Sequence, residues 1–173
     1  VCICKRNSYK TDGAGKMSLT HFDEKGRARM VDVTGKSVTE RVAVTEGFVK
    51  MKPETLKMIL DRKIVKGDVF QVARLAGIMA AKMTHHLIPL CHPLPITSVE
   101  IDFEPDENKS MVKIITKVKT SAQTGVEMEA MVATSISALT IYDMCKGVDK
   151  EMIVSEIKLL YKSGGKSGEF KRN

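Results

Sequence analysis

Two segments with alternating apolar residues, joined by a short polar turn, constrain the fold of this chain most. Apolar or β-branched residues occupy every second position in 97–104 and again in 111–119. Because successive side chains of a β-strand point to opposite faces, each segment predicts a strand with one buried face. The turn at 105–108 predicts that the two strands form a hairpin. The sheet is therefore expected to contain antiparallel strands.

The segments before this hairpin predict one strand and two helices. Residues 39–51 carry β-branched and apolar side chains and predict a strand with an irregular centre at Gly47. Pro53 suits the first position of a short helix, because its fixed φ matches helical backbone. Asp68 can cap a longer helix, whose apolar residues recur at helical spacing until near His85.

The segments after the hairpin predict a further helix and a last strand. Helical spacing runs from Gly125 to a stop at Gly147, and residues 153–161 predict a strand. The order is then strand, two helices, hairpin, helix and strand. This order predicts an α+β fold of ferredoxin-like type, with an antiparallel sheet and helices packed on one face.

The chain of 173 residues is long enough for one domain. Residues 1–16 are polar and without pattern, and they precede Met17. We expect residues 1–16 to be a flexible leader that a shorter chain could lose, and residues 17–173 to form a single domain.

Charge and composition restrict the partners of the chain. There are 28 Lys and Arg against 21 Asp and Glu, a net charge of +7, which favours an anionic partner. Aromatic residues make up only 5%, with no Trp, so there is little material for stacking on bases. No apolar run is long enough to span a membrane, and the scattered cysteines indicate reduced thiols. We expect no nucleic-acid partner, no membrane and a cytoplasmic location, although a nucleic-acid-binding module stays the main non-enzymatic alternative.

Two clusters invite a ligand without matching a standard site. Residues 163–168 resemble a phosphate loop, but the spacing is wrong for a Walker loop, so a mobile basic tail is as good an interpretation as one that closes over an anion. The residues His85, His86, Cys91 and His92 are metal-ligand types at a non-standard spacing, and we expect no metal. His92 lies among prolines that exclude regular structure in 87–95, so its side chain could be held for acid–base or phosphate contact.

Asp143 and Lys146 lie three residues apart near the end of the last predicted helix. This spacing places them on one face, where a solvated ion pair is the ordinary outcome and acid–base catalysis the alternative. Glu127 and Glu129 lie at the start of the same helix, where carboxylates complement the helix dipole. Position alone assigns none of these residues a role.

Four motifs together resemble the cyclic pyranopterin monophosphate synthase (MoaC) family of molybdenum cofactor biosynthesis. They are LIPLCHPL at 87–94, GVEMEA at 125–130, YDMCK at 142–146 and KSGGKSG at 162–168. The resemblance extends from about Met17 to Phe170. It implies a cytoplasmic lyase of ferredoxin-like fold, a phosphorus–oxygen lyase that works as a hexamer built as a trimer of dimers.

The resemblance also implies a reaction and a set of site residues. The substrate would be the cyclised dihydro-GTP, (8S)-3',8-cyclo-7,8-dihydroguanosine 5'-triphosphate, made by a preceding radical SAM enzyme. The products would be cyclic pyranopterin monophosphate and pyrophosphate. No cofactor is expected, and magnesium with the triphosphate is not predicted from the sequence. The implied catalytic residues are Asp143 and Lys146, and the implied substrate-binding residues are Leu90, Cys91, His92, Met128, Glu129, Lys66, Glu127, Lys162, Arg41 and Lys36.

Overall fold

A computed structural model describes residue 21 and residues 25–166 and 168–173 of the chain. The chain divides into two units, residues 1–32 and residues 33–173. In the first unit, the backbone N–H of Arg29 donates to the carbonyl of His21 at 2.9 Å. The expected leader of residues 1–16, and its boundary at Met17, lie outside the described residues.

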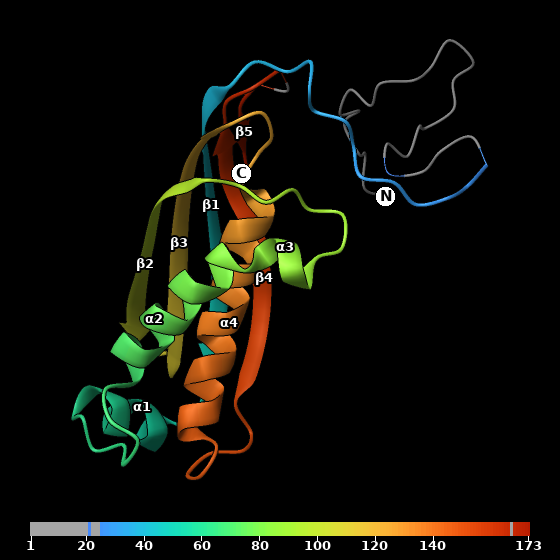
Figure 1. The fold of residues 1–173 in the computed structure, drawn as a ribbon. Coiled ribbons are helices and arrows are strands. Elements are labelled where there is room, and N and C mark those ends of the chain that lie inside the picture. Colours follow the sequence, from blue (N-terminus) through green and yellow to red (C-terminus); the bar gives the residue numbers. More distant parts are fainter. Residues whose placement is uncertain (1–20, 22–24, 167) are drawn as a thin grey trace, which may run out of the picture. The chain divides into compact units, whose positions relative to one another are not determined.

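The second unit contains a five-stranded antiparallel sheet with helices on one of its faces (Figure 1). The strand order is β2-β3-β1-β4-β5. This arrangement confirms the predicted α+β fold of ferredoxin-like type. The elements are β1 (Thr39–Lys50), α1 (Pro53–Leu60), α2 (Val69–Lys82), α3 (Thr84–Leu87), β2 (Ile96–Asp106), β3 (Met111–Ala122), α4 (Glu127–Cys145), β4 (Ile153–Ser163) and β5 (Phe170–Lys171).

Strict alternation in β1 and β3 separates the two faces of the sheet. Val49 of β1 and Ile114 of β3 are fully buried beneath the helices, together with Ile141 of α4. Their neighbours in sequence face the opposite side, where Lys113 pairs with Glu104 at 3.2 Å. The predicted hairpin is confirmed, with both strands longer than the alternation alone indicated.

The irregular centre of β1 at Gly47 is confirmed, and it affects only one neighbouring strand. Pairing of β1 with β3 runs without a shift, whereas pairing with β4 shifts on both sides of Thr45 and Glu46. In β4, Glu156 takes a φ of 52°. A Cβ at Gly47 would lie 2.8 Å from the Cγ2 atom of Thr134, so the glycine lets α4 pack closely on the sheet.

The prediction that the long helix ends near His85 is wrong. Its start is as expected, since the carboxylate of Asp68 accepts the backbone N–H of Gln71 at 3.1 Å. The helix ends at Lys82, because Met83 leaves helical geometry with a φ of −106°, and the short α3 follows. The hydroxyl of Thr84 donates to the carbonyl of Ala80 at 3.3 Å and so competes with the helical backbone for that acceptor.

Part of the C-terminal segment is paired in the sheet, whereas the sequence left a mobile tail and a tail that closes over an anion as equal alternatives. Strand β4 continues to Ser163, beyond the predicted end at residue 161. Phe170 and Lys171 then pair with β4, and Nε of Arg172 donates to the carbonyl of Leu159 at 2.7 Å. None of the helices formed by the described residues is long and apolar enough to cross a membrane.

Candidate functional site

The carboxylate of Asp143 lies between two lysine side chains at the C-terminal end of α4. Its Oδ1 atom is 2.6 Å from Nζ of Lys146, one helical turn away, as the spacing predicted. Nζ of Lys66, from the loop between α1 and α2, donates to Oδ2 at 3.0 Å and to the backbone carbonyl of Asp143 at 2.8 Å. All three side chains are about half exposed. We call Lys66, Asp143 and Lys146 the α4 C-terminal group.

The contacts around Asp143 favour the charged forms of Asp143 and Lys146. Hydrogen bonds from Lys146 and then from Lys66, with their charges, hold the pKa of Asp143 below its ordinary value. The same contact raises the pKa of Lys146. Asp143 is therefore a carboxylate and Lys146 an ammonium group at neutral pH. Because exposed ion pairs add little to stability, these contacts contribute little to the fold.

A second ion pair lies at the opposite end of α4. Glu127, in the first turn of the helix, has its Oε1 atom 3.0 Å from Nζ of Lys162 on β4. Lys162 also pairs with Ala43 of β1 in the sheet register. The strand therefore holds the lysine beside the helix N-terminus, where a carboxylate or a bound anion is favoured.

Arg41 of β1 is buried at this same end and is held by backbone carbonyl groups. Its Nε donates to the carbonyl of Ala122 at 2.9 Å, and its Nη2 donates to the carbonyl of Gln123 at 3.0 Å. The glycine-rich loop after β4 packs against the guanidinium. Gly165 has a φ of 73°, and a Cβ there would collide with Nη1 of Arg41. The backbone carbonyl of Lys36 accepts from the side chain of Gln123 at 3.1 Å, which brings Lys36 to this end too.

The proline-rich loop before β2 supplies a wall of a pocket beside these residues. The pocket has a volume of about 320 Å³, and His92, Gln123 and Val38 are among its lining residues. Leu90 and Cys91 precede His92 in the loop, which is irregular as predicted. Burial, and next the charge of Glu129, raise the pKa of the Cys91 thiol, so Cys91 lies near the start of α4.

Glu129 is a buried carboxyl group in the first turn of α4, with 3% of its surface exposed. Burial raises its pKa from the ordinary value of 4.5 to about 7, and Glu127 adds to this effect, while the backbone N–H of Glu129 opposes it. Met128, next to it, is exposed. Glu129 can therefore hold or release a proton near neutral pH.

Replacing Glu129 by Gln is expected to change how stability depends on pH. Between pH 4.5 and about 7 the folded protein keeps a proton that the unfolded chain has lost, so the stability of the wild type falls as pH rises through this window. Relative to Glu129→Gln, the free energy of unfolding of the wild type should fall by on the order of 2 to 3 kcal/mol between pH 5 and pH 8. Denaturant unfolding of both proteins at the two pH values measures this. A constant difference would show that Glu129 ionises normally.

The predicted site residues thus form two groups rather than one. With a rise of 1.5 Å per residue, the 16 steps of α4 from Glu127 to Asp143 span about 24 Å. Lys66, Asp143 and Lys146 lie together at one end. The α4 N-terminal group lies at the other and comprises Lys36, Arg41, Leu90, Cys91, His92, Glu127, Met128, Glu129 and Lys162.

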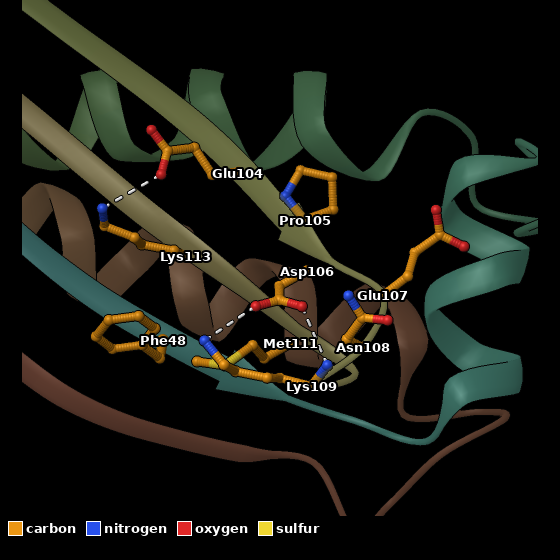
Figure 2. Close-up of a pocket in the computed structure, with 9 residues that line it drawn as sticks. All are labelled: Phe48, Glu104, Pro105, Asp106, Glu107, Asn108, Lys109, Met111 and Lys113. Carbon is orange, nitrogen blue, oxygen red and sulfur yellow. Dashed lines mark hydrogen bonds and ion pairs between the residues drawn. The ribbon is translucent and has the colours of Figure 1, made fainter.

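A larger pocket at the tip of the β2–β3 hairpin contains none of the predicted residues. It has a volume of about 590 Å³ and lies against the sheet face turned away from α2 and α4 (Figure 2). Two ion pairs join charged side chains of this pocket, Lys109 with Asp106 and Lys113 with Glu104, each at 3.2 Å. In the part of the chain that the structure describes, no group of three or more His, Cys, Asp or Glu side chains could hold a metal.

Comparison with known proteins assigns the chain to a family. A sequence model described as the MoaC family matches residues 30–165. The chain belongs to the MoaC family. Three relatives of this MoaC protein carry the name cyclic pyranopterin monophosphate synthase. The one from Pelotomaculum thermopropionicum is 58% identical over 89% of this chain and 91% of its own length. Those from Magnetococcus marinus and Dinoroseobacter shibae are 59% and 60% identical, over 90% and 88% of this chain and 96% of each relative.

Two polar residues that the sequence did not single out contribute to this geometry. The side chain of Gln123 bridges the carbonyls of Thr34 and Lys36, at 3.3 and 3.1 Å. Asp149 accepts a hydrogen bond from the backbone N–H of Lys52, where α1 begins. The one related signal was the start of α1 at Lys-Pro, without a capping side chain of its own, and it did not point to Asp149.

Proposed function

We propose that this MoaC protein is a cyclic pyranopterin monophosphate synthase, a lyase of molybdenum cofactor biosynthesis. It converts the cyclised dihydro-GTP to cyclic pyranopterin monophosphate and releases pyrophosphate. The observation that carries the proposal is the carboxylate of Asp143 held between Lys66 and Lys146 in a chain of this family. A nucleic-acid-binding function has no comparable support.

The two groups on α4 supply the two kinds of chemistry that the reaction needs. Rearrangement of a purine-derived ring into a pyranopterin requires proton transfers, for which Asp143 is the base and Lys146 the acid. Formation of the cyclic phosphate, with pyrophosphate as the leaving group, requires cations that neutralise developing charge. Lys162 at one end of α4 and Lys66 at the other are the cations in this proposal, and His92 is a further contact to phosphate oxygens.

The distance between the two groups favours a site shared between subunits. A nucleoside triphosphate is shorter than the length of α4 that separates Glu127 from Asp143, which favours a substrate site that takes one group from each of two chains. The helix layer also exposes apolar side chains at a spacing of three or four residues, as a subunit interface would. These side chains are Val72, Leu75, Met79, Met83 and Leu87. We infer a homo-oligomer, and from the family resemblance a hexamer built as a trimer of dimers.

The remaining parts of the proposal concern partners and location. The substrate is a small molecule delivered by a radical SAM enzyme, with no nucleic acid and no membrane involved. We propose that the protein works in the cytoplasm and without a resident cofactor. Binding of the negatively charged triphosphate accounts for part of the positive net charge of the chain.

The direct experiment is incubation of the protein with the cyclised dihydro-GTP. Pyrophosphate release and the fluorescence of the pterin product, after its oxidation, are followed together. Both signals should appear in parallel with the wild type and be absent with Asp143→Asn. Pyrophosphate without a pterin would instead indicate a nucleoside triphosphate hydrolase.

Alanine at Lys66, His92 or Lys162 is expected to weaken substrate binding. Each side chain is proposed to contact phosphate oxygens, and a hydrogen bond to a charged group is worth about 1.5 to 3 kcal/mol. Binding of the substrate to an inactive Asp143→Asn background, measured by calorimetry, tests each variant without turnover. Lys109→Ala, at the hairpin tip, is the matched control and should bind normally. Unchanged binding in all three variants would place the triphosphate elsewhere.

A further inference from the structure

Helix α1 begins without a cap from its own sequence and takes one from a distant carboxylate. Lys52 is the N-cap residue and Pro53 the first residue of the helix, and the side chain of Lys52 does not cap it. The Oδ2 atom of Asp149 accepts the backbone N–H of Lys52 at 2.8 Å and the hydroxyl of Thr55 at 3.2 Å. Its Oδ1 atom accepts the N–H of Glu151 at 3.0 Å. Asp149 therefore joins the start of α1 to the segment between α4 and β4.

This carboxylate is charged although it is buried. Only 1% of Asp149 and 3% of Thr55 are exposed. Burial opposes ionisation, but hydrogen bonds from the N–H groups of Lys52 and Glu151 and from Thr55 outweigh it, so the pKa of Asp149 lies below its ordinary value. An anion at the N-terminus of a helix is also favoured by the helix dipole. Removal of the charge should therefore loosen α1 from this segment.

The position of α1 determines where Lys66 lies. Helix α1 leads directly into the loop that carries Lys66, and Ile64 of that loop is buried in the same core cluster as Met144 and Cys145 of α4. The backbone N–H of Asp149 donates to the carbonyl of Cys145 at 3.0 Å. Burial raises the pKa of the Cys145 thiol most. The charge of Asp149 raises this pKa further, and the charge of Lys66 lowers it, so both charged groups lie near the thiol.

We propose that Asp149 is a positioning residue for the α4 C-terminal group: it clamps α1 to the segment after α4 and so holds Lys66 against Asp143. Asp149 touches neither Asp143 nor Lys66 in any hydrogen bond that it makes here, and it acts through the backbone of α1. This role rests on the proposed function, since it concerns the reaction assigned to that group.

The test is a double-mutant cycle of Asp149→Asn with Lys66→Ala, read as turnover and as KM. Asn keeps the size of the side chain but places an amide group where three donors now meet a carboxylate. Because displacement of a site group by about 1 Å can cost up to about 10²-fold, Asp149→Asn should lower kcat/KM by about 10-fold. In the Lys66→Ala background the same change should lower it by less than about twofold, because residues that act through one another are not additive. A merely structural role would lower it equally in both backgrounds.

Two further variants separate positioning from stability. Thr55→Val removes one hydrogen-bond donor to Asp149 with little change of shape. It should lower kcat/KM by less than Asp149→Asn, with the same dependence on Lys66. It replaces Asp149→Asn in the cycle if that variant does not fold. Glu151→Gln is the matched control, since it breaks only the exposed pair with Lys52 that joins the same two segments, and it should leave turnover unchanged.

Three results would overturn the positioning role. These are an unchanged kcat/KM in Asp149→Asn, equal losses with and without Lys66, and a loss in Glu151→Gln as large as in Asp149→Asn. If Lys66→Ala itself turned over normally, the assignment of Lys66 in the proposed function would fail as well. If Asp149→Asn lowered kcat/KM equally with and without Lys66, while Lys66→Ala itself was defective, only the positioning role of Asp149 would be refuted.

Discussion

Asp143→Asn should lower turnover of the cyclised dihydro-GTP by about 10² to 10⁴-fold, the usual contribution of a positioned acid–base group. Asn keeps the shape of Asp143 and one acceptor oxygen for the two lysines, but it cannot take a proton. Because Lys66 and Lys146 hold the pKa of Asp143 below its ordinary value, the loss should be present across the neutral and mildly acidic range. The change lies at an exposed position, so the fold should be unaffected.

Three measurements on this variant decide between a catalytic and a structural role. Turnover is measured by pyrophosphate release, substrate affinity by calorimetry and oligomer size by light scattering. Affinity and size should match those of the wild type. Normal turnover, or a loss that accompanies unfolding, would reduce Asp143 and Lys146 to an ion pair at a helix end.

Lys146 is expected to be as important for turnover as Asp143. Lys146→Ala should lower turnover by a similar factor, because Lys146 is the proposed acid and lies 2.6 Å from the carboxylate of Asp143. The double variant should be little worse than the worse single one, since groups that act as a unit are not additive. Losses that multiply in the double variant would show that the two residues act independently.

Most of the fold could be predicted because its strands and helices follow simple periods. The alternation of apolar residues predicted the hairpin, and the order of strands and helices predicted the ferredoxin-like class. The break at Met83 could not be predicted, because it depends on a local competition for the carbonyl of Ala80. The pairing of β5 was missed for a related reason: Phe170 and Lys171 form a strand only because β4 offers them an edge.

The candidate site was predictable in its parts but not in its arrangement. Spacing placed Asp143 and Lys146 on one helix face, and the structure confirms their contact. The approach of Lys66 depends on how α1 and its loop pack, which no local pattern encodes. The positions of Glu127 and Asp143 at opposite ends of one helix followed from the helical spacing, and α4 confirms them. The sequence did not show which of the other site residues gather at each end, because the family resemblance transfers residues without the distances between them.

The central claim is that the two groups on α4 meet across subunits, and mixed oligomers test it most directly. One chain carries Asp143→Asn and the other carries His92→Ala with Lys162→Ala. The two chains are expressed together, purified by two different tags and assayed at low substrate concentration. Light scattering checks that the mixed protein has the size of the wild type.

If each site takes its α4 C-terminal group from one subunit and its α4 N-terminal group from another, random assembly leaves about one quarter of the sites intact. The mixture should therefore regain about one quarter of the wild-type turnover, although each parent is nearly inactive. Turnover no higher than the average of the two parents would contradict the account, because it would mean that each chain uses both groups by itself.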